Sequence, residues 1–427
     1  MEYTWNLDPL YHGFDDPRYA ADLDTLRAQV EKLTALPEKL PGMAPTEGLK
    51  AGIAILEQME ELTSKLFLYA ELRQSVNTRD PEPGSKIGQI MTVYSAAAAP
   101  RAAFQAWIAK LDLTEALADP QLKDYAFLLT RTQENSKYLL AGDGEAVAAR
   151  FGISGGSAWS EMQQYLTSTV KVNYRGTVTN LSSIRNMAYD EDPAVRKDAY
   201  EAELACYGAI ADPVAYALNS IKMETISDCA LRGYASPLDR TLKGADMKRE
   251  TLDAMLGAME EYLPKFHRYL KVKAAALGHK NGLPWYDLFA PMGASSTTFT
   301  PEQAHDYLVE LFSHFDSELS QMIDRAFRNR WIDFFPADGK AGGAFCAGAP
   351  SLGESRVLTN FDGKLGDVVT LAHELGHAFH NQCIRDHRPL NRDYSMPLAE
   401  TASTFNECVV MASAIRNAAD DSERLNL

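Results

Sequence analysis

The stretch DVVTLAHELGHAFHNQ, residues 367–382, carries the pattern on which the fold and the chemistry of this chain depend. Its apolar residues recur at three- and four-residue spacing, which is typical of an amphipathic helix. Asp367 is the expected N-cap of that helix. His373 and His377 lie four residues apart, so their side chains differ by about 40° in direction and about 6 Å in height. Both imidazoles can therefore face one metal ion.

Glu374 follows the first histidine and projects to the side of the pair. From there it cannot easily bind the same ion, but it can reach a water molecule held on the metal. This HExxH pattern is typical of zinc hydrolases in which the glutamate is the general base. The structural alternative is a pair of hydrogen-bonded histidines on a half-buried helix face, because HExxH also arises by chance.

A tetrahedral catalytic zinc needs a third protein ligand. His380 follows His373 by seven residues, about 10 Å along the helix axis, which is too far for two zinc–nitrogen bonds of roughly 2.1 Å. We therefore expect His380 to line the cleft. The longer metzincin pattern HExxHxxGxxH is rejected, because His380 and Cys383 occupy its glycine position and its last histidine position.

Glu400 is the predicted third ligand. It lies in YSMPLAETASTFNECVVMASAI, residues 394–415, a second predicted helix with Ser395 as its N-cap. His387 is the competing candidate, but it lies in a polar loop, where rigid ligation is less favoured. Helical spacing places three further polar residues on the face of Glu400, from which they can hold the ligands in place: Ser403, Thr404 and Glu407.

Most of the remaining chain is predicted to be helical, including residues 17–35, 47–77 and 85–113, where Pro100 can kink or divide the helix. The segment GISGGSA, residues 152–158, indicates a loop or a boundary. Residues 341–363 are rich in glycine and predict a small β-hairpin with strands near 344–346 and 356–361, the alternative being an irregular surface loop.

The composition is that of a globular protein, with 46% hydrophobic residues and a formal net charge of −16. An acidic chain argues against nucleic acid and against anionic lipid as partners. No run of eighteen apolar residues and no signal-peptide pattern occurs. The five cysteines are scattered, which fits free thiols in a reducing compartment. We therefore expect a cytoplasmic protein that does not contact a membrane.

The segments LAHELGHAFH and LAETASTFNE together strongly resemble the oligoendopeptidase F branch of the thimet oligopeptidase family. WNLDPLY near the start, ISGGSAWSEM, DEDPAVRKDAYEA and KAGGAFCAG also look like that branch, so the resemblance extends along essentially the whole chain. It implies that His373, His377 and Glu400 bind one zinc ion and that Glu374 is the general base.

The same resemblance implies a mainly α fold in two lobes around a deep channel that admits short unstructured peptides. A small β-hairpin, residues 343–361, would lie beside the HExxH helix and pair with the substrate backbone. We expect an N-terminal helical lobe over residues 1–190 and a zinc-peptidase domain over 191–427. The implied activity is zinc-dependent hydrolysis of internal bonds in short peptides.

Chains of this family continue beyond the second metal helix, into a segment that supplies a histidine and tyrosines to the oxyanion. No HxxxxxFYxY-like segment occurs here, so we expect the catalytic domain to be incomplete at its C-terminus, with the remainder deleted, cleaved off or carried on a separate chain that would be a partner. Two alternatives stay open: a non-catalytic metal-binding helical protein derived by truncation, and a zinc hydrolase of non-peptide amides.

Overall fold

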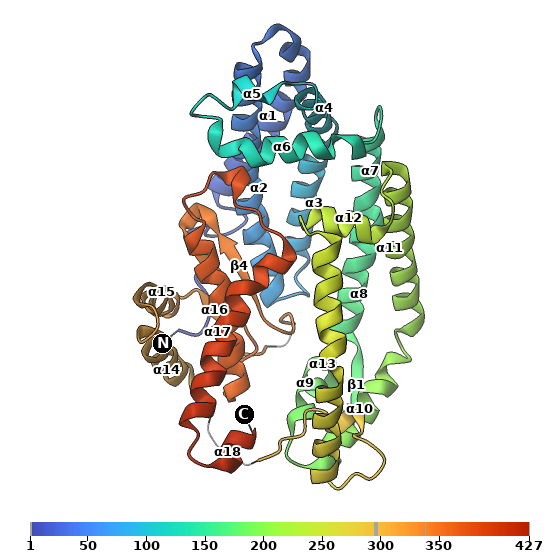
Figure 1. Ribbon diagram of the computed structural model, residues 1–427, viewed down its shortest axis with the longest axis vertical. Helices are drawn as coiled ribbons and strands as arrows, with labels where there is room; N and C mark the ends of the chain where they lie inside the picture. The colour runs from blue at the N-terminus through green and yellow to red at the C-terminus, as the bar shows by residue number, and fades with distance from the viewer. Residues whose placement is uncertain (1, 294–297, 338, 427) are drawn as a thin grey trace.

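The computed structural model describes residues 2–293, 298–337 and 339–426, and helices dominate it (Figure 1). The predicted mainly α fold class is confirmed. The N-terminal helices share one buried core that contains Leu26, Leu49 and Phe104. The break predicted near Pro100 falls just before α4, and Pro100 lies in the first turn of that helix. These helices are α1 (Pro17–Lys39), α2 (Pro45–Val76), α3 (Pro81–Ser95), α4 (Ala98–Ile108), α5 (Leu113–Ala116) and α6 (Ala126–Asn135).

The middle of the chain forms a second group of helices and one two-stranded sheet. Its elements are α7 (Gly144–Gly152), α8 (Ala158–Thr169), β1 (Lys171–Tyr174), β2 (Thr177–Asn180), α9 (Leu181–Asn186), α10 (Pro193–Tyr207), α11 (Ala211–Arg232), α12 (Pro237–Gly244) and α13 (Arg249–Ala276). The sequence analysis did not predict the β1–β2 hairpin. Its turn is formed by Arg175 and Gly176, whose φ angles are positive, 47° and 83°. The expected lobe boundary at residues 190–191 lies between α9 and α10 and stays a prediction.

Residues 152–158, interpreted above as a loop or boundary, instead form a kinked turn of π-helix that joins α7 to α8. Gly155 sits at the kink with φ −91° and ψ −117°. A Cβ atom at this position would lie 2.4 Å from Oε2 of Glu224 on α11. The backbone N–H of the next residue, Gly156, donates a hydrogen bond to the same carboxylate.

The last part of the chain holds the HExxH helix and a three-stranded sheet. Its elements are α14 (Pro301–Ser313), α15 (Ser317–Arg328), β3 (Ile332–Asp333), β4 (Phe345–Ala349), β5 (Glu354–Leu358), α16 (Leu365–Cys383), α17 (Met396–Asn417) and α18 (Asp421–Asn426). The predicted hairpin is confirmed as the antiparallel pair β4–β5, with slightly different strand bounds. The parallel pairing of β3 with β5 was not predicted. In the described part of the chain, β4 is an edge strand with β5 as its one partner strand.

Helix α16 begins three residues earlier than predicted, so Asp367 is not its N-cap. Lys364 occupies the N-cap position. Asp367 lies in the first turn, where its carboxylate accepts hydrogen bonds from the backbone N–H groups of Asp362 at 3.0 Å and Lys364 at 2.9 Å. The residue therefore still stabilises the helix start, from inside the helix.

Helices α16 and α17 pack side by side with their backbones in direct contact (Figure 1). A Cβ atom at Gly376 would lie 2.6 Å from the carbonyl oxygen of Ala402 and 2.7 Å from Cα of Ser403. The Nδ2 group of buried Asn406 donates a hydrogen bond of 3.0 Å to the carbonyl of Ala372. These contacts fix how α17 lies against the HExxH helix.

We expect Gly376→Ala to lower the free energy of unfolding by at least about 1–3 kcal/mol, because its methyl group would force two helix backbones apart. The metal affinity should fall in parallel, since the two helices carry the candidate ligands described below. Thermal unfolding and metal titration measure the two effects. Gly366→Ala is the matched control, because that glycine lies on the same helix with nothing within 4 Å of its Cβ position. Equal stability of the two variants would contradict this account.

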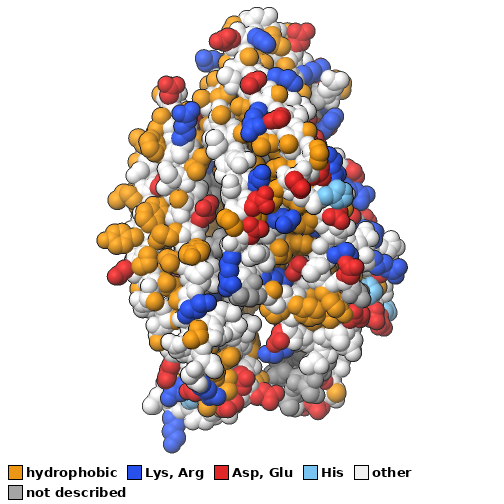
Figure 2. All heavy atoms as spheres, turned by 180° about the vertical axis from the view of Figure 1, so that it is seen from behind, with side chains coloured by type: hydrophobic (Ala, Val, Ile, Leu, Met, Phe, Trp, Pro, Cys, Tyr) orange, Lys and Arg blue, Asp and Glu red, His pale blue; other side chains and the backbone are white. Residues whose placement is uncertain are grey.

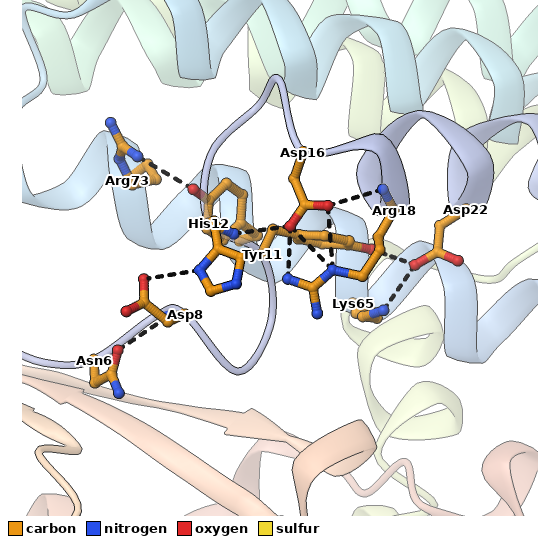
Figure 3. Close-up of polar contacts among 10 residues, drawn as sticks. Asn6, Asp8, Tyr11, His12, Asp16, Arg18, Asp22, Lys65 and Arg73 are labelled. Atoms are coloured by element: carbon orange, nitrogen blue, oxygen red, sulfur yellow. Dashed lines mark hydrogen bonds and ion pairs between the residues drawn. The ribbon is translucent and has the colours of Figure 1, made fainter.

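The segment before α1 is held by a polar and aromatic cluster (Figure 3). Tyr11 donates its hydroxyl to Asp22 at 2.7 Å, and Lys65 on α2 donates to the same carboxylate oxygen at 2.7 Å. Asp16 accepts hydrogen bonds from the backbone and side chain of Arg18, which lower the pKa of its carboxyl. The start of the chain is thereby fixed against α1 and α2.

From this anchor, residues 3–6 run along the sheet that precedes α16. The backbone N–H of Asn6 donates to the carbonyl of Arg330 at 2.8 Å, and the N–H of Phe334 donates to the carbonyl of Tyr3 at 2.9 Å. Fully buried Arg356 on β5 donates its Nε–H to the carbonyl of Asn6 at 3.0 Å. The N-terminal strap, residues 3–6, therefore braces the strands beside the candidate site.

Candidate metal centre

Three side chains from α16 and α17 meet at one point. Nε2 of His373 and Nε2 of His377 lie 3.3 Å and 3.5 Å from Oε2 of Glu400. In the described part of the chain these residues form the one group whose ligand atoms all lie within 4.8 Å of one another. The structure thus brings together the three residues that the sequence predicted as ligands.

The spacing of these atoms fits a tetrahedral zinc ion. Bonds of roughly 2.0–2.1 Å at tetrahedral angles separate two ligand atoms by about 3.4 Å. The observed separations of 3.3 Å and 3.5 Å are close to that value. Two imidazole nitrogens and one carboxylate oxygen are also a donor set that catalytic zinc uses.

His373 is oriented by a second carboxylate. Its Nδ1 contacts Oε1 of Glu407, which lies about two turns beyond Glu400 on the same face of α17. A proton on Nδ1 that is donated to Glu407 leaves the lone pair of Nε2 directed at the metal position. Glu407 therefore fixes both the tautomer and the direction of the His373 ring, as its predicted position on the face of Glu400 suggested.

Glu407→Gln should lower the affinity for zinc by roughly 10–100-fold without removing a ligand, because a neutral amide holds the imidazole less strongly than a carboxylate does. Competition with a chromogenic chelator measures the change. Cys408→Ser is the matched control, since Cys408 is the next residue on the same helix and its side chain is exposed. An unchanged affinity in Glu407→Gln would show that Glu407 is dispensable for the site.

The other two ligand candidates are also held in the form that binds a metal. Burial lowers the pKa of His377, which favours its neutral imidazole, and the backbone of Ala399 accepts its hydrogen bond. Ser403 donates its hydroxyl to Oε2 of Glu400 at 2.7 Å, and this bond, with the two nearby histidines, lowers the pKa of that carboxyl. A neutral histidine and an ionised carboxylate are the forms that ligate.

Glu374 follows His373 on α16 and is buried, with 6% of the residue exposed. Burial is the main reason that its pKa is raised to about 7, and the carboxylates of Glu400 and Glu407 raise it further. A carboxyl group with a pKa near the working pH can accept a proton and release it again. This behaviour is what a general base requires.

The remaining sequence candidates lie outside the group of ligand atoms. His380 is half-buried, stacks on Tyr394 with ring centroids 4.2 Å apart, and has a pKa that burial lowers. His387 is exposed in the turn after α16. Thr404 is exposed and donates its hydroxyl to the carbonyl of Glu400, so its predicted place among the residues that support the ligands is not confirmed.

Two supporting residues escaped the sequence analysis. Asn406 joins α17 to the backbone of α16. Asn381 accepts a hydrogen bond of 3.2 Å from the hydroxyl of Tyr394 and donates one of 3.2 Å to Ser355 on β5, so it connects the HExxH helix to the hairpin. The sequence offers no clear signal for them, because Asn381 stands between His380 and Gln382, and Asn406 is followed by Glu407.

Known proteins match this chain along most of its length. Residues 186–426 match the family model described as peptidase family M3, and residues 101–171 match the one described as oligopeptidase F. The chain is 24% identical to an oligoendopeptidase F homolog of Lactococcus lactis, covering 99% of this chain and 72% of that protein. It is 23% identical to oligopeptidase PepF of Bacillus subtilis, covering 99% of this chain and 64% of that protein.

A solved structure shares the fold. The crystal structure of oligoendopeptidase-F from Enterococcus faecium superposes with a TM-score of 0.66 and 17% identity, covering 94% of this chain and 68% of that one. At this identity the likeness concerns the fold alone. The chain spans about two thirds of the length of several proteins that it matches.

Proposed function

Because the chain belongs to peptidase family M3, we propose that it is a zinc-dependent metalloendopeptidase that hydrolyses internal bonds of short unstructured peptides. The observation that carries the proposal is the group of His373, His377 and Glu400 with buried Glu374 beside it. A purely structural zinc site has no use for a general base, the role that Glu374 can fill here. The names of the relatives from Lactococcus lactis and Bacillus subtilis support an oligopeptidase.

The side chains of this protein have separate roles in the proposed reaction. His373, His377 and Glu400 would hold the zinc ion, which when bound polarises the scissile carbonyl and makes water more acidic. Glu374 takes a proton from the attacking water on its carboxylate and then delivers it to the nitrogen of the leaving amine. Its raised pKa of about 7 suits both transfers near neutral pH.

The edge strand β4 is the proposed contact for the peptide backbone. It is short, has one partner strand in the described part of the chain, and packs against α16. A peptide that adds to such an edge gains main-chain hydrogen bonds with little dependence on its side chains. This preference suits an enzyme that acts on many short peptides.

The proposed location is the cytoplasm. All five cysteines are free thiols, which fits a reducing compartment. No described helix combines the length and the apolar character that crossing a bilayer requires.

The proposal is tested by assaying a quenched-fluorescent short peptide with the zinc-loaded chain, with and without a chelator. Hydrolysis that the chelator abolishes and added zinc restores is the expected result, and it should be slow because no HxxxxxFYxY-like segment supplies donors to the oxyanion here. Metal binding without hydrolysis of any peptide in a mixed library would instead favour the non-catalytic metal-binding protein. Hydrolysis of simple amides but not of peptides would favour the non-peptide amidase.

A further inference from the structure

Asn381, in the last turn of α16, contacts three other parts of the fold. Its Nδ2 group donates a hydrogen bond of 3.2 Å to Oγ of Ser355 on β5, and its Oδ1 accepts one of 3.2 Å from the hydroxyl of Tyr394. Its carboxamide also lies against Gly348 of β4, where a Cβ atom would be 3.1–3.4 Å from Nδ2, Cγ and Oδ1. One half-buried side chain thus joins the HExxH helix to both strands of the hairpin and to the segment that leads into α17.

The same face of α16 carries the proposed general base. Asn381 follows Glu374 by seven residues, so the two side chains point in nearly the same direction, about 10 Å apart along the helix. Cys346 and Gly348 are two residues apart on β4 and face the same side of the sheet, about 7 Å apart. Burial raises the pKa of the Cys346 thiol, and the nearby carboxylate of Glu374 raises it further. β4 therefore runs alongside α16, with Cys346 near Glu374 and Gly348 against Asn381.

Most other contacts of β4 with its surroundings are apolar. Cys346 packs against the core to which α16 contributes, whereas Phe345 and Ala347 pack against the core of the N-terminal helices. Apolar contacts have no preferred direction, whereas a hydrogen bond fixes a distance and an angle. Among the residues that the structure describes, Asn381 makes the one hydrogen bond between α16 and the two strands of the hairpin. Asn381 is therefore the group that fixes the hairpin at one height along α16.

We propose that Asn381 is a positioning residue: it fixes β4 beside Glu374 and the three ligands, and so fixes the scissile bond of a peptide that pairs with β4. This inference rests on the proposed function and on the proposed pairing of the peptide with the edge of β4. A displacement of about 1 Å in a bound substrate can cost about 10²-fold in rate. Removing Asn381 should therefore slow turnover more than it weakens binding, because the main-chain groups at the edge of β4 stay available.

Asn381→Ala should lower kcat roughly 10–100-fold and leave KM and the affinity for zinc nearly unchanged. Hydrolysis of a quenched-fluorescent peptide and chelator competition measure these quantities. Asn391→Ala is the matched control, because Asn391 is also half-buried and its Nδ2 donates a hydrogen bond of 2.8 Å to the carbonyl of Asp124, outside the hairpin. It should change none of the three. A raised KM with an unchanged kcat in Asn381→Ala would overturn the proposal.

Tyr394→Phe tests whether the network acts as one unit. It removes the hydroxyl that Asn381 accepts and keeps the ring that stacks on His380. The kcat should fall less than in Asn381→Ala, and the double variant should be no slower than Asn381→Ala alone, because both changes act through one carboxamide. Losses that multiply would show that the two side chains act independently. Thermal unfolding confirms that each variant is folded.

A short peptide hydroxamate gives a measurement that does not require hydrolysis. Its hydroxamate chelates the bound zinc while its backbone pairs with β4, and the same peptide ending in an amide can only pair. The peptide is built from alanine and polar residues, because Tyr216, Met223 and Leu231 on α11 are more than half exposed. Figure 2 shows hydrophobic side chains gathered along the edge of the molecule on which α11 lies, where a hydrophobic peptide would also bind.

The ratio of the two affinities for the zinc-loaded chain reports how well β4 places a peptide on the metal. Asn381→Ala should lower this ratio roughly 10-fold or more and leave the affinity of the amide peptide unchanged, whereas Asn391→Ala should change neither. An unchanged ratio in Asn381→Ala would overturn the positioning role even if the parent chain hydrolyses peptides. A lowered ratio in a chain that hydrolyses no peptide would support the positioning role and count against the proposed function alone.

Discussion

Glu374→Gln is expected to bind zinc as the parent chain does and to hydrolyse peptides roughly 10²–10⁴-fold more slowly. Glutamine has nearly the same shape as glutamate but cannot accept the proton from the attacking water. The three ligand atoms belong to His373, His377 and Glu400, so the exchange leaves them in place. Metal content by mass spectrometry and turnover of a quenched peptide are the two measurements.

Glu310→Gln is the control for this variant, because Glu310 is an exposed glutamate on α14. It should change neither metal content nor turnover. If Glu374→Gln loses its zinc, Glu374 is a ligand and the division of roles is wrong. If it keeps both metal and activity, another group is the base.

Glu400→Ala should lose zinc, and His387→Ala should keep it. The first change removes one of three protein ligands, so the affinity should fall by more than the roughly 10–100-fold that loss of an outer partner costs. Two imidazoles without a carboxylate also leave the charge of the ion less well balanced. His387 lies in the turn after α16, outside the group of ligand atoms.

Equilibrium dialysis against zinc with a competing chelator compares these two variants directly. Their thermal unfolding without metal should be similar to that of the parent, since both side chains are exposed. Equal metal loss in both, or loss in His387→Ala alone, would overturn the assignment of Glu400.

The ligand group was predictable because its parts are local. The distance between His373 and His377 follows from helix geometry, and Glu400 lies on a second helix whose polar face is visible in the sequence. Thr404 was misassigned because a helix face is wide: about 40° separates it from Glu400 on one side, whereas Ser403 and Glu407 lie on the other side. Which side of α17 faces α16 depends on how the two helices pack. The spacing of residues within one helix gives no information on that packing.

Other features depend on contacts between distant residues. In the sequence, Gly376 is an ordinary glycine within a helix. The structure shows that the backbone of α17 at Ser403 lies too close to leave room for a side chain there. β3 consists of two residues and pairs with β5, which lies more than twenty residues further along. The kink at Gly155 lies against Glu224, which comes from another helix. No local pattern predicts these partners.

The N-terminal strap has a consequence for how the chain is made. Its hydrogen bond from Arg356 to Asn6 joins residues 350 positions apart. A ribosome that adds roughly 5–20 residues per second synthesises Arg356 about 20–70 s after Asn6. The helices α1 to α6 can collapse on one another during this time, whereas the strap waits as an exposed extended segment. Translation speed and chaperone access, in addition to thermodynamic stability, should therefore influence how much of the chain reaches the native state.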